Sequence, residues 1–292
     1  FGHFDSIEPM FEELIPLVKK SICQRQRPWF AMLHIMDVHT HSICIDQLFR
    51  SPLKLFKRLT RLPRIRRLCR KFGYEQHVLY FLGLSVVDDL LGELFGEFKN
   101  DESRENPIVI VTSDHGNTFE SHDKRTVPDL PNRFFRSDLE IPLIVSTNSP
   151  KFELAFGLHD SRDVGATLLE CLGLEVREGY DGCSLASKKG RKFVISENAG
   201  RNYCDLGRDD LNFAVTGLHS KLFAALRGSE LVVTNYYDLK SDPGEMKNIV
   251  DRPEAQDWIV MLLDHLWCER AKIFRERGCE RLATVSAGVA NE

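Results

Sequence analysis

The sequence lacks both a C-x-x-C cysteine pair and any long apolar run. Its eight cysteines are scattered along 292 residues, which excludes zinc knuckles and thioredoxin-type motifs. No stretch approaches the roughly 18 to 20 uninterrupted apolar residues that a membrane-spanning helix requires. The formal net charge is only -4, which gives no reason to expect nucleic acid as a partner. With 42% hydrophobic residues, the chain can bury one large core or two modest ones.

One segment has no acidic residue at all. Between Asp46 and Glu75 the charged side chains are all cationic, and apolar residues recur among them at near-helical spacing, although Pro63 is expected to break or kink a helix. We interpret residues 47–74 as a basic insertion. Three roles stay open: a lid over an anionic substrate, a peripheral contact of residues 50–71 with acidic lipid or polysaccharide, or a solvated surface. The cations are Arg50, Lys54, Lys57, Arg58, Arg61, Arg64, Arg66, Arg67, Arg70 and Lys71.

Helical and strand-like segments alternate over residues 1–189. Helical spacing of apolar residues predicts amphipathic helices, and short, nearly continuous apolar runs predict strands buried on both faces. The alternation favours an α/β fold with a doubly wound, mainly parallel sheet. The predicted helices cover residues 7–22, 80–98 and 160–172, the last capped by Asp160 or Ser161 and stopped by Gly173, and the predicted strands cover 29–36, 108–112 and 141–146.

The pattern changes after about residue 190. Short β-rich runs such as NFAVTG and KLFAALRG are separated by Gly, Asn and Ser, which predicts a small antiparallel sheet. A helix with Trp258 and Leu266 on one face follows. We therefore predict that residues 190–292 form a small β-rich subdomain with a terminal helix.

Polar residues follow two of the predicted strands. Ser113-Asp114-His115-Gly116 comes directly after the strand at 108–112, and open α/β sheets bind ligands beyond the carboxyl ends of their strands. An adjacent carboxylate and imidazole can bind one divalent cation where the backbone turns sharply, and Gly116 permits such a turn. The alternative is a strand-ending turn with an Asp cap and a hydrogen-bonded histidine.

The second polar cluster is Asp37-Val38-His39-Thr40-His41, after the predicted strand at 29–36. His39 could donate a hydrogen bond to an anionic ester or protonate a leaving oxygen. Clusters at the ends of two buried strands favour one site at that edge of the sheet. By contrast, we interpret the DLKSDPGE segment as a turn with a structural role.

Six segments in order resemble the sulfatase family of the alkaline phosphatase superfamily. Together they span nearly the whole chain, and they match that family's D-x-H-x-P loop, Y-x-x-x-V-x-x-x-D helix, D-N-G or D-H-G strand, R-V-P-L-I-I strand, V-S-x-x-D-L segment and Y-D-L-x-x-D-P-x-E segment. In this chain they read PWFAMLHIMDVHTHS, YFLGLSVVDDLLGELFGEF, NPIVIVTSDHG, LEIPLIVST, LHDSRDVGATLLECLGLEVREGYDGCSL and NYYDLKSDPGEMKNI.

The resemblance implies an alkaline-phosphatase-like fold and a metal-dependent hydrolase of sulfate esters, with an anionic substrate such as a sulfated saccharide. It implies a divalent ion, commonly Ca2+ with Mn2+ or Zn2+ as alternatives, bound by Asp114 and His115. It places His39 against the sulfate or leaving group, His122 at the position of a second histidine, and Lys124 near the active-site lysine.

The sequence departs from the family in one block. The nucleophile motif C/S-x-P/A-x-R, from which the family makes formylglycine, is absent, as is the strand with paired Asp ligands. We therefore expect the carboxyl-terminal portion of a longer hydrolase, inactive by itself, whose targeting region and compartment are not encoded here. The alternatives are a phosphodiesterase or phosphonate monoester hydrolase of the same superfamily and a non-catalytic module that binds polyanions.

Overall fold

The structure is a computed structural model that describes residues 11–23, 29–38, 56, 59–99, 107–117, 134–147, 155–186, 190–199 and 211–279. The chain divides into two compact units, residues 1–107 and 108–292, which are described in turn. The subdomain boundary expected near residue 190 stays a prediction. Within the described ranges, no helix is long and apolar enough to span a bilayer.

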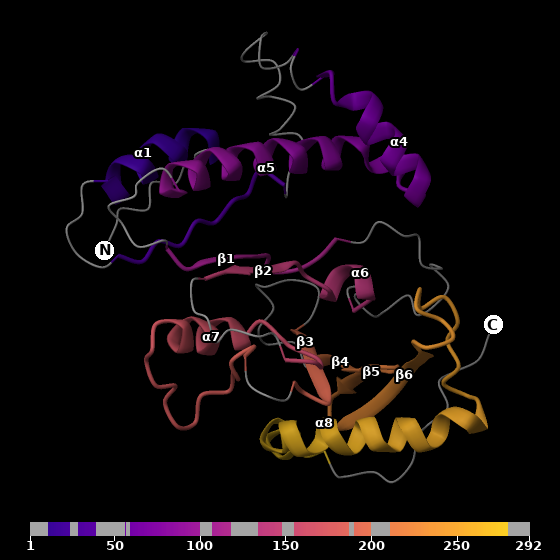
Figure 1. Cartoon of the computed structure of the whole chain (residues 1–292). Helices are drawn as coiled ribbons and strands as arrows, with labels where there is room; N and C mark the ends of the chain where they lie inside the picture. The colour runs from indigo at the N-terminus through magenta and orange to yellow at the C-terminus, as the bar shows by residue number, and fades with distance from the viewer. Residues whose placement is uncertain are drawn as a thin grey trace. The chain divides into compact units, whose positions relative to one another are not determined.

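Helices dominate the described part of the first unit (Figure 1). Helix α1 runs from Phe11 to Cys23 and α5 from Val78 to Lys99, so the helices predicted at 7–22 and 80–98 are confirmed. Ile15 of α1 packs with one face of α5, and Lys19 forms a 3.0 Å ion pair with Glu93. The buried face of α5 consists of Val86, Val87, Leu90 and Leu94.

Helix α4 spans Leu62–Phe72 in the basic segment. Pro63 lies in its first turn, where the missing N–H is not needed and the fixed φ suits a helix. Phe56 and Leu59 are also helical, and Thr60 and Arg61 form a turn before α4 begins. The helical pattern is therefore interrupted just before Pro63, which agrees with the expected break. Ile65 and Cys69 are buried against Leu82 of α5, so part of the predicted insertion is a packed helix.

Residues 29–36 do not form the predicted strand. Phe30 and Met32 are 74% and 81% exposed, whereas Leu33 and Ile35 pack against the cluster of α1 and α5. A strand needs a hydrogen-bonded neighbour, and among the described residues none pairs with this segment. Its apolar run is therefore buried on one side at most.

The second unit begins with β1 (Val109–Thr112) and β2 (Leu143–Ser146), which confirms both predicted strands. They pair antiparallel, with Val109 opposite Ser146, although the sequence predicted a mainly parallel sheet. Antiparallel pairs occur within otherwise parallel sheets of α/β folds. The four-residue helix α6 (Arg136–Leu139) precedes β2, and α7 (Asp163–Cys171) follows it.

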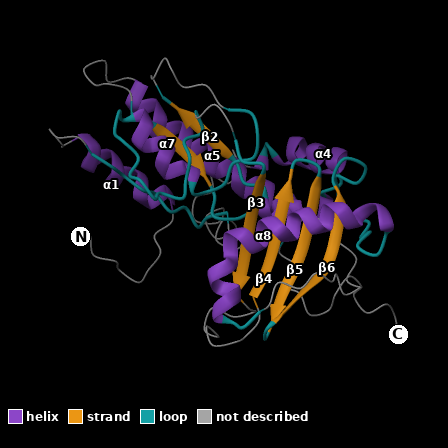
Figure 2. Cartoon of the chain, turned by 90° about the horizontal axis from the view of Figure 1, so that it is seen from below, coloured by secondary structure: helices purple, strands orange, loops and turns teal. Residues whose placement is uncertain are grey.

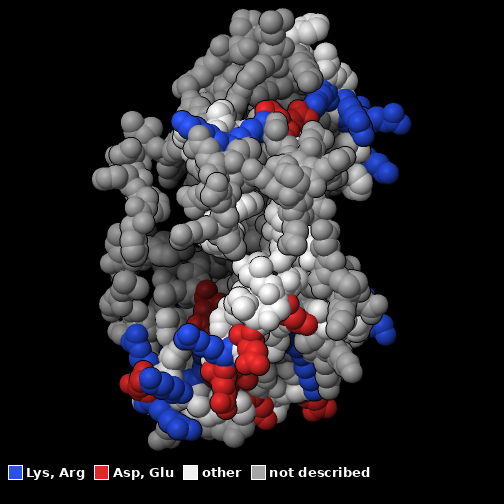
Figure 3. All heavy atoms as spheres, turned by 60° about the vertical axis from the view of Figure 1, so that its left-hand side comes forward, with Lys and Arg blue, Asp and Glu red and all other residues white. Residues whose placement is uncertain are grey.

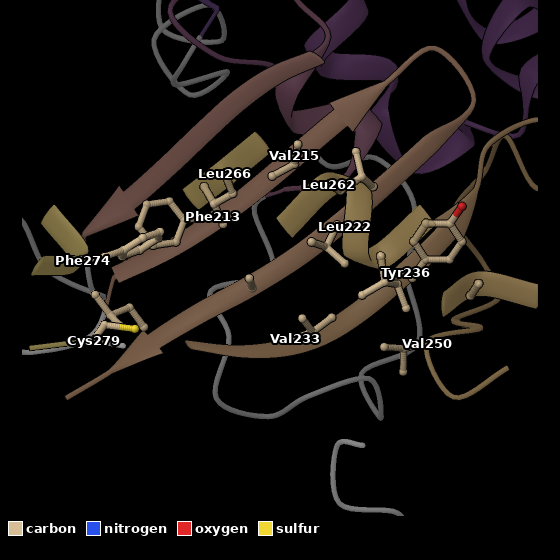
Figure 4. Close-up of a cluster of buried hydrophobic side chains, with 14 residues drawn as sticks. Phe213, Val215, Leu222, Val233, Tyr236, Val250, Leu262, Leu266, Phe274 and Cys279 are labelled. Carbon is tan, nitrogen blue, oxygen red and sulfur yellow. The ribbon is translucent and has the colours of Figure 1, made fainter. Parts of the chain in front are cut away.

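A four-stranded antiparallel sheet in chain order confirms the β-rich pattern predicted after residue 190. Alternate side chains of its strands point to opposite faces, and helix α8 (Gln256–Glu276) covers one of them, as Figure 2 shows. Figure 4 shows the core on this face, where Phe213, Leu222 and Val233 meet Leu262 and Leu266 of α8. The strands are β3 (Phe193–Ala199), β4 (Leu211–Gly217), β5 (Ser220–Arg227) and β6 (Glu230–Asp238).

The end of α7 allows a first prediction. Gly173 has a φ of 69°, and its N–H donates to the carbonyl of Glu170 at 2.9 Å, as expected for a helix stop. Gly173→Ala should lower the free energy of unfolding by about 1 kcal/mol because alanine resists this conformation. Urea unfolding followed by circular dichroism measures the change. Gly92→Ala, inside α5 with open space at its Cβ, should instead stabilise the chain by about 0.5–1 kcal/mol; the same sign for both variants would contradict this reasoning.

Candidate functional site

The Asp114-His115-Gly116 turn lies at the carboxyl end of β1. The His115 N–H donates to Asp114 Oδ1 at 2.9 Å, and the Gly116 N–H donates to the carbonyl of Asp138 in α6 at 2.7 Å. The side chains of Asp114 and His115 are 72% and 55% exposed. The backbone is therefore held from one side while both side chains face solvent.

The donor atoms of Asp114 and His115 fit one cation. His115 Nδ1 lies 2.7 Å from the carbonyl oxygen of Gly116, so the tautomer that makes this bond has its proton on Nδ1 and its lone pair on Nε2. That arrangement is typical of metal-binding histidines. His115 Nε2 and Asp114 Oδ2 lie 3.6 Å apart, and two ligands at roughly 2.0–2.6 Å from a shared ion have about this separation.

Divalent ions take four or more ligands in proteins. Among the described residues, no group of three His, Cys, Asp or Glu side chains could hold a metal. Asp114 and His115 alone therefore do not complete such a ligand set.

The other predicted site residues, His39, His122 and Lys124, lie outside the described residues. Asp37, which precedes His39 in the first unit, is buried with 3% exposure. In the second unit, Glu197 of β3 forms an ion pair with Arg270 of α8.

Gly116 allows close contact between the turn and α6. A Cβ at this position would lie 2.0 Å from the backbone oxygen of Ser137 and 2.9 Å from its carbonyl carbon. Gly116→Ala should therefore push the turn away from α6 and cost about 1–3 kcal/mol of unfolding free energy. Thermal or urea unfolding measures this cost against Gly96→Ala, a helical glycine with open space at its Cβ. Wild-type stability of Gly116→Ala would show that the turn does not depend on this contact.

Gly116 contacts the segment 134–139, which includes α6, and this segment packs on the four-stranded sheet. Phe134 and Phe135 are buried on the face opposite α8, with ring centroids 5.8 Å and 5.6 Å from that of Phe223. Phe135 also lies 6.3 Å from the ring of Tyr237. The sheet therefore supports α6 directly and the Asp114-His115 turn through α6.

A buried ion pair completes this support. Lys221 Nζ lies 2.5 Å from Glu245 Oε1 and donates to the carbonyl of Phe134 at 2.9 Å. Glu245 Oε2 accepts the N–H of Arg136 at 2.6 Å. Both charged residues are 2% exposed, and burial lowers the pKa of Lys221 although Glu245 opposes this shift. The pair thus holds both residues that flank Phe135.

Sequence reasoning missed Lys221 and Glu245 as a pair. Lys221 begins an otherwise apolar run of β5, and Glu245 lies in the DPGE turn that was interpreted as structural. That interpretation agrees with the role seen here, because Glu245 holds backbone and does not face solvent. A lysine at an inward position of a strand was the only local signal.

The second unit also contains a cavity of about 450 Å³, lined by Arg162, Arg191, Lys192, His265, Arg270 and neighbouring residues. Its arginines are engaged: Arg162 with Asp160 at 2.5 Å, Arg191 with Asp163 at 2.5 Å, and Arg270 with Glu197. Burial alone would raise the pKa of Asp160, but hydrogen bonds from Arg162 hold it below its usual range. These ion pairs account for the three arginines that line the cavity, so their charges give no reason to expect a bound anion there.

Comparison with known proteins identifies a family that this chain matches. A family model described as Sulfatase matches residues 2–174. An arylsulfatase of Clostridium perfringens is 22% identical over 196 residues, which cover 63% of this chain and 37% of the relative. The chain spans about a third of the length of the curated relatives it matches.

Two solved structures share the fold. The putative sulfatase yidJ of Bacteroides fragilis aligns with a TM-score of 0.59 at 16% identity, over 91% of this chain and 57% of the neighbour. A protein named BT4656, solved in complex with its substrate D-glucosamine-2-N,6-O-disulfate, aligns with a TM-score of 0.50 at 23% identity, over 70% of this chain and 42% of the neighbour. These similarities confirm the predicted α/β, alkaline-phosphatase-like fold class.

Proposed function

The chain belongs to the sulfatase family of the alkaline phosphatase superfamily, and from this premise we propose that it is the carboxyl-terminal portion of a metal-dependent hydrolase of sulfate esters. The observation that carries the proposal is the Asp114-His115 pair at the end of β1, with Nε2 and Oδ2 at 3.6 Å. The proposal includes a nucleophile contributed by another part of the protein, so that this chain alone is inactive.

Asp114 and His115 would hold the divalent ion. Calcium is the proposed ion because the carboxylate is a hard oxygen ligand, while the imidazole would also suit Mn2+ or Zn2+. When bound, such an ion polarises the ester oxygens as a Lewis acid. His39 is proposed to contact the sulfate or protonate the leaving oxygen, and His122 and Lys124 are proposed to complete the anion site.

The proposed substrate is a sulfated saccharide. The family acts on sulfate esters, and BT4656, which shares the fold, has a disulfated glucosamine as its substrate. A polymeric form of such a substrate would also fit the proposed peripheral contact through residues 50–71.

The test is product analysis with matched sulfate and phosphate esters of one alcohol and with glucosamine 6-sulfate. We expect the protein extended upstream of Phe1 to release sulfate in the presence of Ca2+, and the chain alone to release none. Faster release of the alcohol from a phosphate diester or a phosphonate monoester of that alcohol would instead favour a phosphodiesterase or phosphonate monoester hydrolase. Binding without turnover by the extended protein would favour the non-catalytic polyanion-binding module.

A further inference from the structure

Helix α4 presents a face made entirely of cations. Ile65 and Cys69 are buried against α5, and the side chains around the rest of the helix are exposed. We call five of them the basic face: Arg64, Arg66, Arg67, Arg70 and Lys71. Figure 3 shows blue side chains projecting at the upper right of the view, in the region of α4.

The arginines of the basic face have no internal partner in the described part of the chain. Its four arginines make no side-chain hydrogen bond or ion pair there, and Lys71 lies over the ring of Phe72 at 5.3 Å. Arg61, one turn earlier, behaves differently, because it binds Ser85 and Asp89 of α5. Contacts within the first unit therefore explain the position of Arg61, but they do not explain why five cations lie together on the basic face.

These cations repel one another along the helix, although Arg70 and Lys71 lie in its last turn, where the helix dipole favours a cation. Arg66 and Arg70 are four residues apart, as are Arg67 and Lys71, and like charges at this spacing repel. Arg64 lies in the first turn, where the helix dipole disfavours a cation and where no acidic residue compensates. The repulsion between neighbouring cations and the position of Arg64 are better explained by an external anion than by the stability of the helix.

We propose that the basic face binds a linear polysulfated saccharide. This inference rests on the proposed function, because it gives the enzyme a polymeric substrate held by sulfates that are not being hydrolysed. Four of the five cations are arginines, whose planar guanidinium groups pair with two oxygens of one anion. Arg64 and Lys71 lie about 10 Å apart along the helix axis, so a chain with repeated sulfates contacts several cations, whereas one small ester cannot.

An acidic membrane fits the face less well. A helix that binds a bilayer inserts its apolar side between the headgroups, and the apolar side of α4, with Leu62, Ile65 and Cys69, is packed against α5. Only Leu68 and Phe72 remain exposed, at 47% and 61%. Binding through surface charge alone needs no apolar side, so the basic face is better matched to a charged polymer than to a bilayer.

The experiment measures binding of heparin, a polysulfated polysaccharide, by calorimetry in EDTA at low and moderate salt. Arg66→Gln/Arg67→Gln/Arg70→Gln should weaken binding roughly tenfold or more and reduce its salt dependence. The matched control is Arg177→Gln/Arg227→Gln/Arg275→Gln, which removes three exposed arginines from other elements. The control should bind within about twofold of wild type. The first triple variant should unfold at the same or a higher temperature, because the repulsion is relieved.

Unchanged heparin affinity in the first variant, or an equal loss in both variants, would overturn the proposal. So would tighter binding to phosphatidylserine vesicles than to heparin. Because EDTA removes the metal, the binding result does not depend on hydrolysis. Absence of sulfate release from a small ester by the extended protein with Ca2+ would overturn the proposed catalytic function and leave the heparin result standing.

Discussion

Replacing Lys221 with methionine is expected to lower the free energy of unfolding by about 3–5 kcal/mol. The substitution removes the only charge that faces the buried carboxylate of Glu245 within hydrogen-bonding distance in the described structure, and it breaks the bond to the carbonyl of Phe134. The carboxylate would keep the N–H of Arg136 as its hydrogen-bond donor but would be buried without a counter-charge, so its lost hydration would be only partly compensated. Urea unfolding at pH 7 gives the difference from the shift of the midpoint.

Two further variants separate this effect from a loss of volume. Lys221→Met/Glu245→Gln should be less destabilised than Lys221→Met, because the neutral amide leaves no buried charge. Lys240→Met, at an exposed position, should change the stability by less than about 0.5 kcal/mol. If Lys221→Met lost less than about 1 kcal/mol, the ion pair would not hold the segment that contacts Gly116.

Asp114→Asn is expected to reduce the affinity for a divalent ion by at least about 100-fold, since changes beyond the ligands themselves already cost 10- to 100-fold in such sites. Asparagine keeps the size of the side chain and an oxygen that can accept the His115 N–H, so the turn should survive while the ligand charge is lost. Titration of the upstream-extended protein with Ca2+ and with Mn2+ measures the affinity, and sulfate release should fall in parallel.

The control is Asp88→Asn, an exposed carboxylate on α5, which should bind metal as wild type does. Equal stability of Asp114→Asn and wild type in urea would exclude unfolding as the cause of lost binding. Metal binding that is unchanged in Asp114→Asn would remove Asp114 from the ligand set. The Asp114-His115 turn would then be the strand-ending turn that the sequence offered as the alternative.

The candidate site was predictable where its residues are neighbours in the chain. Asp114 and His115 follow a four-residue strand after a single serine, so local periodicity placed them near the end of β1. The position of His115 Nε2 was not predictable, because it depends on the bond between Nδ1 and the carbonyl of Gly116. The close contact of Gly116 with Ser137 joins residues that are far apart in sequence, and no local pattern indicates it.

Sequence alone determined the family, the main helices and the antiparallel sheet after residue 190, because the spacing of apolar residues specifies which face of an element is buried. It did not determine what each face contacts. The apolar run at 29–36 finds no strand neighbour in the described structure, and Lys221 meets Glu245 across 24 residues. Only the tertiary structure decides such outcomes, because pairing and the burial of charge depend on groups brought together by packing.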